Sequence, residues 1–397
     1  MNELVLNVKS YGTKGDGITN DTAAIQAVID ACAAAGGGIV WFPLGRYKTT
    51  ASLRVKFSNV VLMGAGNGSV IIPVGSFDTV IFQSDTAATY IYNDRVIDLL
   101  FDETGKTGGR LMYGSYLANF ILERVHGAHG RNGFEFNNFN NVDLHNIRVT
   151  DYQGGAGAAY VRLTGGIAGA GRSDVANFFR AVFGGARSVG MKGIDVDGFV
   201  HTVNGWAVHF VNIGAEGLHA RNTVGALNVP SFFTFDDFEC DYPELECVRL
   251  DVGVRMNFNN LQLNGSKSRA GIYISDGVKT ATFTGGFVSG SRQAGIAIAG
   301  QDVTVTGMQF LFNSSDEFGG AKGAYPGIIV GFSSKGVTVT GCRSGDAATS
   351  NYQSFGCQVD TGADDFVITG NNFRNNINAG VNNGAGTGPT KLVATNI

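Results

Sequence analysis

Short strands with alternating apolar and polar residues recur along the second half of the chain at a nearly constant spacing. The segments AGIYISDG (270–277), AGIAIAGQ (294–301) and PGIIVGFS (326–333) each place two apolar residues two positions apart after a small residue. Such alternation turns one side of a strand inward and the other outward. Counting similar segments, the first apolar positions are spaced 24, 24, 32, 29 and 24 residues apart, at Val248, Ile272, Ile296, Ile328, Cys357 and Val381. A repeated unit of this length indicates a solenoid.

A second strand and a third short strand follow each of these segments. The second strands end in Thr-Gly, as in TATFTGG, DVTVTGM, GVTVTGC and DFVITGN, and a third strand such as 309–311 comes next. A stack of hairpins would need tight two-residue loops between longer strands. The regular spacing instead stacks each strand on its counterpart one coil below, which predicts an all-β fold, a right-handed parallel β-helix.

The upstream half follows the same pattern with longer connections. We place first strands of three coils at 132–138, 158–164 and 206–212. Two long insertions, at about 165–190 and 212–230, are expected to overhang the exposed sheet, and loops of this length on a rigid scaffold often carry function.

The N-terminal segment predicts a helix instead of a coil. Asn20 or Asp21 can cap it, the apolar residues Ile25, Val28 and Ile29 follow at helical spacing, and glycines end it. An amphipathic helix here would cover the open end of the solenoid. We therefore divide the chain into a capping helix with the strand that leads into the coils, residues 1–50, and one continuous β-helix, residues 51–397.

Composition narrows the function classes. Charged residues make up 16% of the chain and apolar ones 44%, with 59 glycines and only 6 prolines, and the net charge of −4 offers no basic face for nucleic acid. No apolar run approaches the roughly 20 residues of a membrane span, and the start is not a signal peptide. The five irregularly spaced cysteines are expected to be core thiols, and no metal site or cofactor is expected.

The first quarter of the chain resembles a known superfamily. YGTKGDGITNDTAAIQAVIDACAAAGGGIVWFPLGRYKT (11–49) and VVLMGAGNGSVIIP (60–73) look like the opening of the pectate-lyase-superfamily β-helix proteins, most of all phage tailspike depolymerases. The resemblance implies an extended polysaccharide substrate, a homotrimer and an extracellular or virion-associated location. Segment 121–151 is similar to the active coil of mannuronan C5-epimerases, but with Asn132, Glu135 and Asn137 where that family has tyrosine, aspartate and histidine.

Alternation predicts which side chains line the exposed sheet. The outward residues of the first strands are expected to form one line, whose last three members have no charged or aromatic side chain. In chain order they are Glu135, Arg162, His209, Arg249, Tyr273, Ala297, Ile329 and Gln358. Asn137 and Asp251 lie two positions further along, and Trp206 stands beside the line, where it could stack on a sugar. Asp195 is placed on another face. The charged members could also be a cross-strand charge ladder, and Asp236-Asp237 occupies a bend.

This line favours β-elimination on a uronate polysaccharide. Arg162 and Arg249 suit the sugar carboxylate, His209 is the candidate base, and Tyr273 could protonate the leaving oxygen. Glu135 completes the predicted catalytic set, and Trp206, Asp251, Glu246, Glu216 and Asn137 the substrate-binding set. One alternative is a glycoside hydrolase that uses loop carboxylates from Glu216, Glu244 or Glu246. Another is a non-catalytic polysaccharide-binding adhesin or tail fibre.

Overall fold

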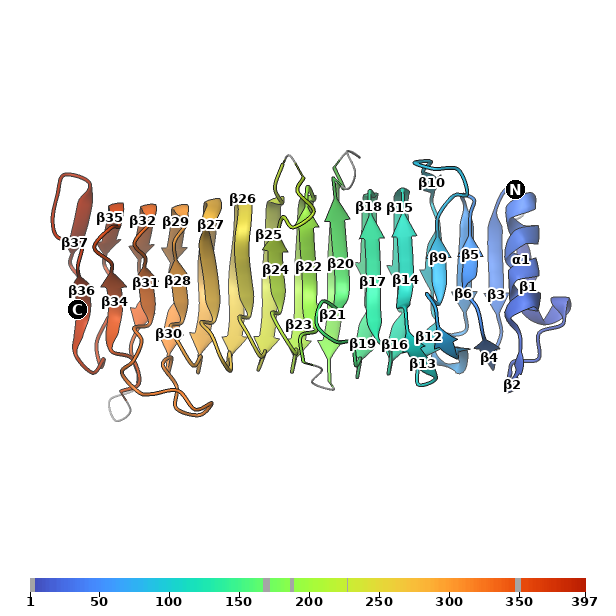
Figure 1. Ribbon diagram of the computed structural model, residues 1–397, viewed down its shortest axis with the longest axis horizontal. Helices are drawn as coiled ribbons and strands as arrows, with labels where there is room; N and C mark the ends of the chain where they lie inside the picture. Colours follow the sequence, from blue (N-terminus) through green and yellow to red (C-terminus); the bar gives the residue numbers. More distant parts are fainter. Residues whose placement is uncertain (1–3, 167–171, 186–188, 227, 347–350) are drawn as a thin grey trace. The chain divides into compact units, whose positions relative to one another are not determined.

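The computed structural model describes residues 4–166, 172–185, 189–226, 228–346 and 351–397. They form two compact units, Met1–His201 with Val224–Ala226, and Thr202–Thr223 with Leu227–Ile397. Within each unit the strands pair in parallel with their counterparts on neighbouring coils (Figure 1). Each unit is therefore a right-handed parallel β-helix, as the sequence predicts. The proposed division at residue 50 stays a prediction.

Most strands of both units are short, and the longest, β26 and β27, lie in the second unit. The first unit holds α1 (Thr22–Ala34), the 3₁₀ turns η1 (Val8–Tyr11) and η2 (Gly66–Gly68), and strands β1 (Val5–Asn7), β2 (Asp16–Asn20), β3 (Gly38–Phe42), β4 (Gly45–Thr49), β5 (Leu53–Val55), β6 (Val60–Gly64), β7 (Ser69–Pro73), β8 (Gly75–Ser76), β9 (Val80–Phe82), β10 (Ile91–Tyr92), β11 (Arg95–Ile97), β12 (Leu100–Asp102), β13 (Lys106–Gly108), β14 (Arg110–Ser115), β15 (Leu117–Glu123), β16 (His126–Ala128), β17 (Asn132–Asn137), β18 (Asn140–His145), β19 (Arg148–Thr150), β20 (Ala159–Gly165), β21 (Ala176–Gly184) and β22 (Lys192–Gly198). The second holds nearly all of β23 (His201–Val211), and β24 (Leu218–Arg221), β25 (Ser231–Asp241), β26 (Val248–Asn264), β27 (Ile272–Ser289), β28 (Ile296–Ile298), β29 (Gln301–Thr306), β30 (Gln309–Leu311), β31 (Ile328–Val330), β32 (Lys335–Thr340), β33 (Arg343–Ser344), β34 (Phe355–Val359), β35 (Asp364–Thr369), β36 (Ala379–Asn383) and β37 (Lys391–Ala394).

The strands of the second unit pair in the register that the sequence repeat predicts. Each coil has a first, a second and a third strand, separate in β28, β29 and β30 and joined end to end in β26 and β27. The first strands pair through the predicted apolar positions, in the order Val248, Ile272, Ile296, Ile328, Cys357 and Val381. All six are buried or nearly so.

Bends inside the long strands are made by residues with positive φ. Asp237 (φ 54°) and Asn260 (φ 50°) turn β25 and β26 between their second and third strands. Asn and Asp tolerate this left-handed conformation better than other side-chain-bearing residues. The Asn259 amide donates to Asp236 Oδ1 at 2.7 Å across the two coils. The prediction that Asp236-Asp237 forms a bend is confirmed.

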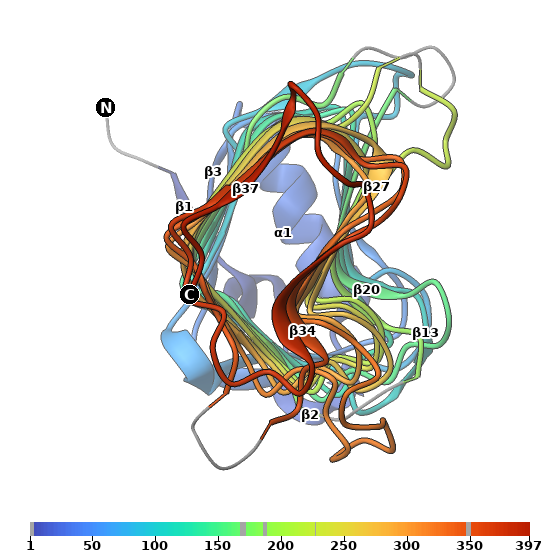
Figure 2. The same cartoon turned by 90° about the vertical axis from the view of Figure 1, so that its left-hand side faces the viewer.

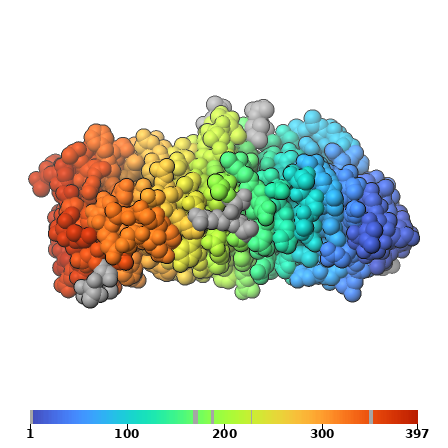
Figure 3. Space-filling model, turned by 60° about the horizontal axis from the view of Figure 1, so that its bottom comes forward, coloured from blue at the N-terminus to red at the C-terminus, as the bar shows by residue number. Residues whose placement is uncertain are grey.

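Aromatic and sulfur side chains fill the interior of the coils. In the second unit the rings of Phe235, Phe258 and Phe283 stack nearly parallel, with centroids 5.8 and 4.9 Å apart. All five cysteines are buried and unbridged, as expected of core thiols. Within each unit successive coils lie directly against one another (Figure 3). Among the described residues, no helix has the length and apolarity that crossing a membrane requires.

The predicted capping helix covers the first coil of the first unit. Helix α1 buries Ile25, Val28, Ile29 and Cys32 against η1, β3 and β5, and Figure 2 shows it lying across the end of the coil that contains β1 and β3. Such a helix shields apolar coil surface that no further coil covers.

The two long insertions are not simple loops. Part of 165–190 is β21, which pairs with β18 and β19 and completes the second and third strands of a coil. Likewise 212–230 contains β24, a first strand paired with β26. Residues 167–171, 186–188 and 227 of these segments lie outside the described residues. The prediction was wrong: β21 supplies second and third strands, which lack the first-strand pattern, and the short first strand at 217–220, which has that pattern, was not counted among the repeats.

Candidate functional site

The outward line of the first unit differs from the predicted one at its third member. Glu135 pairs with Arg162, as expected, but the next residue across from Arg162 is Asp195 on β22. Asp195 therefore belongs to the first strands, and its placement on another face was wrong. His209, predicted to follow Arg162, lies on β23.

Three charged residues of this line and two beside it form a ladder that we call the charge ladder: Glu135, Arg162 and Asp195 on the line, and Arg110 and Asp78 next to it. The Arg110 guanidinium holds Asp78 at 2.7 Å and Glu135 at 2.8 Å, and Arg162 contacts Glu135 at 4.0 Å and Asp195 at 3.0 Å. Each cation thus contacts a carboxylate on each side. The alternative interpretation of Glu135 and Arg162, as members of a cross-strand charge ladder, describes what the structure shows.

The outward line of the second unit begins with a histidine that the sequence reading missed. His219 on β24 pairs with Arg249, Arg249 with Tyr273, and Tyr273 with Ala297. The line then runs through Ile329 and Gln358, as expected. His209 was assigned to this line because the alternation of Trp206–Asn212 looks like a first strand, but period two is the same in all three strands.

Around these positions lies a group that we call the first-strand cluster: Glu216, His219, Glu246, Arg249, Asp251 and Tyr273. His219 Nε2 lies 2.7 Å from Asp251 Oδ2, and His219 Nδ1 lies 3.5 Å from Glu216. Arg249 Nε donates to Asp251 Oδ1 at 2.9 Å, and its Nη1 lies 3.9 Å from Glu246. The guanidinium carbon lies 5.5 Å from the centre of the Tyr273 ring.

Two carboxyl groups of this cluster are buried. The side chains of Glu216 and Glu246 are each 5% exposed, and one oxygen of each, Oε2, is buried with no hydrogen-bond partner. Burial, with the nearby Glu216 carboxyl, raises the pKa of Glu246 against the opposing pull of Arg249. A buried carboxyl with a raised pKa keeps its proton closer to neutral pH, as a general acid must.

Asp251 is shifted in the opposite direction. Burial opposes its ionisation, but hydrogen bonds from His219 and Arg249 outweigh burial and lower the pKa of Asp251 below its ordinary value. Asp251 is 31% exposed and open to solvent. Glu246 and Asp251 therefore contact one guanidinium group, and their environments shift their pKa values in opposite directions. Such a pair can divide the roles of general acid and general base.

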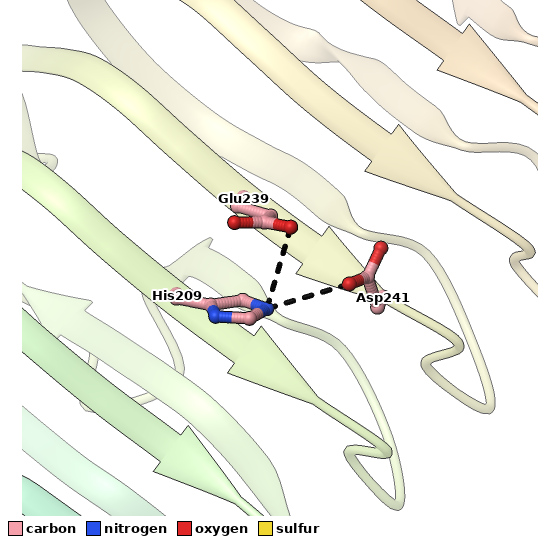
Figure 4. Close-up of side chains that lie close together, drawn as sticks. All are labelled: His209, Glu239 and Asp241. Carbon is pink, nitrogen blue, oxygen red and sulfur yellow. Dashed lines mark hydrogen bonds and ion pairs between the residues drawn. The ribbon is translucent and has the colours of Figure 1, made fainter.

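His209 lies in a second group of the same unit, which we call the third-strand triad: His209, Glu239 and Asp241 (Figure 4). They stand on the third strands within β23 and β25. His209 Nε2 faces Asp241 Oδ2 at 3.4 Å and Glu239 Oε1 at 3.6 Å. The hydrogen bond with Asp241 raises the pKa of His209 against burial. His209 therefore lies on a third strand, whereas Arg249 and Tyr273 lie on first strands.

The remaining predicted binding residues lie apart from the first-strand cluster. Trp206, 38% exposed, precedes the bend at Ala207 in β23 and so does not stand on a first strand. Asn137, in the first unit, is only 8% exposed, and its amide donates to the Tyr113 hydroxyl at 3.3 Å.

A repeat in the sequence could have found His219. Glu-Gly-Leu-His (216–219) and Glu-Cys-Val-Arg (246–249) have the same pattern of acid, small residue, apolar residue and cation, 30 residues apart. Asp195 occupies the equivalent place after Lys-Gly-Ile (192–194). Glu216 and Glu246, expected as loop acids or binding residues, do meet Arg249 and His219 in the structure.

The chain matches a family model over residues 5–215, described as rhamnogalacturonase A/epimerase, pectate lyase-like. This match covers more than half of the chain. The chain belongs to the pectate lyase-like family. The matched residues include the N-terminal segment that carries the resemblance.

Individual relatives of this pectate lyase-like chain match over short stretches or in fold alone. The mannuronan C5-epimerase AlgE5 of Azotobacter vinelandii is 49% identical over 73 residues, 17% of this chain and 7% of the epimerase. The chain thus spans less than a tenth of that relative's length. Tailspike protein 3 of bacteriophage CBA120 aligns with a TM-score of 0.73 at 15% identity over 96% of this chain and 59% of the tailspike. The A-module of A. vinelandii epimerase AlgE4 aligns with a TM-score of 0.58 at 20% identity, over 98% of this chain and 99% of the module.

Proposed function

We propose that this chain is a polysaccharide depolymerase that hydrolyses glycosidic bonds at the first-strand cluster. The observation that carries the proposal is the placement of Glu246 and Asp251 on one guanidinium group, Arg249, with one carboxyl buried and the other half-exposed. Since both contact the same group, their oxygens lie within roughly 10 Å of each other, a separation compatible with the carboxyl pairs of glycosidases.

Each residue has a role that follows from its surroundings. Glu246, whose pKa is raised by burial, acts as the general acid and gives its proton to the glycosidic oxygen as the carbon–oxygen bond breaks. Asp251, ionised, accepts a proton from the water whose oxygen bonds to the anomeric carbon. Arg249 fixes both carboxyl groups, and His219 orients Asp251 through the 2.7 Å contact. Transfer of one proton to Glu246 and loss of one from Asp251 restore the starting state.

The cluster suits hydrolysis better than the β-elimination that the sequence favours. A lyase needs a cation available to the uronate carboxylate, but Arg249 already contacts Asp251 and Glu246. It also needs a base, and both ring nitrogens of His219 face carboxylate oxygens. In the first unit, Arg162 is likewise occupied by Glu135 and Asp195.

The comparisons support a saccharide substrate and a virion-associated or extracellular location. One relative is named for action on mannuronan, a polysaccharide, and a tailspike shares the fold. Trimeric assembly stays a prediction of the resemblance, and sedimentation velocity would measure it. Tyr273, on the same line as Arg249, offers an aromatic face beside the carboxyl pair for a sugar ring.

The test is a polysaccharide panel with three readouts. The chain is incubated with neutral and uronate-containing bacterial polysaccharides, and viscosity, new reducing ends and absorbance near 235 nm are followed. Hydrolysis predicts falling viscosity with new reducing ends and no rise in absorbance. Glu246→Gln and Asp251→Asn should each abolish most of the cleavage.

Two results would overturn the proposal. Cleavage accompanied by absorbance near 235 nm would show elimination, the reaction that the sequence favours. Binding of a polysaccharide without any loss of viscosity would show an adhesin or tail fibre. Glu135→Gln, in the charge ladder, separates the two units: loss of cleavage there but not in Glu246→Gln would move the site to the first unit.

A further inference from the structure

We propose that the third-strand triad of His209, Glu239 and Asp241 is a binding site for a divalent transition-metal ion such as Zn²⁺. The triad lies on strands that contain none of the first-strand cluster, and the proposed hydrolysis makes no use of it. Its donor atoms, one imidazole nitrogen and two carboxylate oxygens, all lie within 4.8 Å of one another (Figure 4).

The distances fit ligands of a common ion better than direct hydrogen bonds. Two ligand atoms that each lie about 2.1 Å from a tetrahedral Zn²⁺ are about 3.4 Å apart. His209 Nε2 lies 3.4 Å from Asp241 Oδ2 and 3.6 Å from Glu239 Oε1. A charge-assisted hydrogen bond would be about 2.7–2.9 Å, as it is between His219 and Asp251 at 2.7 Å.

Both carboxylates face the same ring nitrogen. A single ion placed beside Nε2 of His209 can therefore be reached by both oxygens. At His219 the two carboxylates face opposite nitrogens, Nδ1 and Nε2, so one ion could not be shared by all three groups. Of these two histidines of the described residues, His209 is the one with the arrangement of a chelate.

Neighbouring backbone and side chains hold the triad in place. His209 and Asp241 stand near the ends of β23 and β25, which pair in the parallel sheet. The Asn264 amide donates to Asp241 Oδ1 at 2.7 Å, which leaves Oδ2 directed at His209. Such outer hydrogen bonds orient metal ligands and strengthen their binding. Glu239 is the most exposed of the three side chains, at 38%.

The donor set selects the class of ion. Ca²⁺ and Mg²⁺ prefer oxygen ligands alone, whereas an imidazole nitrogen with carboxylates suits Zn²⁺ and its first-row neighbours. Three protein ligands leave at least one coordination position for water, as in open zinc sites. The side chains are 21–38% exposed, so an ion can enter from solvent.

The experiment is two titrations of the full chain: one with Zn²⁺, monitored by calorimetry, and one with Co²⁺, monitored by visible absorption. We expect one ion per chain and a Co²⁺ spectrum without the thiolate charge-transfer band that cysteine ligands produce. His209→Gln, which keeps the size of the side chain, should weaken Zn²⁺ binding by at least about tenfold, and Asn264→Ala should weaken it less.

The matched control is His219→Gln, which removes the other histidine flanked by two carboxylates. It should leave the stoichiometry and affinity for Zn²⁺ unchanged. The proposal is overturned if the wild-type chain takes up no Zn²⁺ in a one-to-one complex, or if His209→Gln binds it as tightly as wild type. Melting temperatures of the metal-free variants separate lost binding from lost folding.

Discussion

Two histidines of the second unit each stand between two carboxyl groups, and the difference between them separates two kinds of chemistry. His219, 8% exposed, contacts Asp251 and Glu216 through opposite ring nitrogens. His209, 31% exposed, faces Asp241 and Glu239 through one nitrogen. The same residue types therefore form the proposed proton-transfer cluster on the first strands and the proposed ion-binding triad on the third.

Burial is the second difference between these sites. In the first-strand cluster burial raises the pKa of Glu246, whose Oε2 has no hydrogen-bond partner, whereas hydrogen bonds from His219 and Arg249 lower the pKa of Asp251. In the third-strand triad all three groups reach solvent, so charge is screened and affinity depends on geometry. Residue composition alone does not distinguish a catalytic pair from a ligand set.

The largest expected effect is on cleavage rate. Glu246→Gln and Asp251→Asn should each lower kcat about 10²–10⁴-fold, since each removes one partner of the acid–base pair. Asp236→Asn is the matched control, because it makes the same change at a bend and keeps an oxygen that can accept from Asn259. Equal losses in all three variants would sink the assignment. The release of reducing ends at saturating substrate measures kcat.

The affinity for Zn²⁺ should depend on Asp241 in the third-strand triad. Asp241→Asn is expected to weaken Zn²⁺ binding about 10–100-fold, because it removes a ligand charge. Asp251→Asn makes the identical change in the first-strand cluster and should leave the affinity as it is. Calorimetric titration of both variants decides between the sites; a reversed order would place the ion beside His219.

The pH dependence of kcat should be bell-shaped. Activity requires ionised Asp251, so it falls as pH drops through the lowered pKa of Asp251. It also requires protonated Glu246, so it falls about tenfold per unit once pH passes the raised pKa of Glu246. Tyr273→Phe should keep both limbs. A profile that is flat on the alkaline side would contradict the role of Glu246.

The smallest expected effect is on stability. Because the pKa of Glu246 is raised by folding, its charged form costs stability above that pKa, and the cost vanishes below the unfolded pKa. Glu246→Gln should therefore raise the free energy of unfolding more at neutral pH than at about pH 4. Glu239→Gln, in the exposed triad, should change it by less than about 0.5 kcal/mol. Urea unfolding measures both.

Much of the fold could be predicted because each coil repeats the same alternation of apolar and polar residues. Val248, Ile272 and Ile296 recur every 24 residues and pair as that spacing implies. The helix from Thr22 to Ala34 was equally readable from its apolar spacing. Where the spacing becomes irregular, before Leu218, alternation could not tell a first strand from a third.

The site was predicted in part. Arg249 and Tyr273 are neighbours as expected, and Glu216 and Glu246 do reach the same cluster. His209 and Asp195 were misplaced because their strands were assigned to the wrong class, and His219 was missed because its strand was taken for an insertion. Opposite pKa shifts and a shared ring nitrogen depend on atomic distances, which no sequence pattern contains.

The most direct test of the central claim is cleavage of a susceptible polysaccharide in ¹⁸O-labelled water, with mass spectrometry of the products. Hydrolysis at the first-strand cluster predicts one solvent oxygen at the anomeric carbon of each new reducing end and none in the other new end, and loss of these products in Glu246→Gln. Products that lack solvent oxygen and carry an unsaturated sugar would contradict the account.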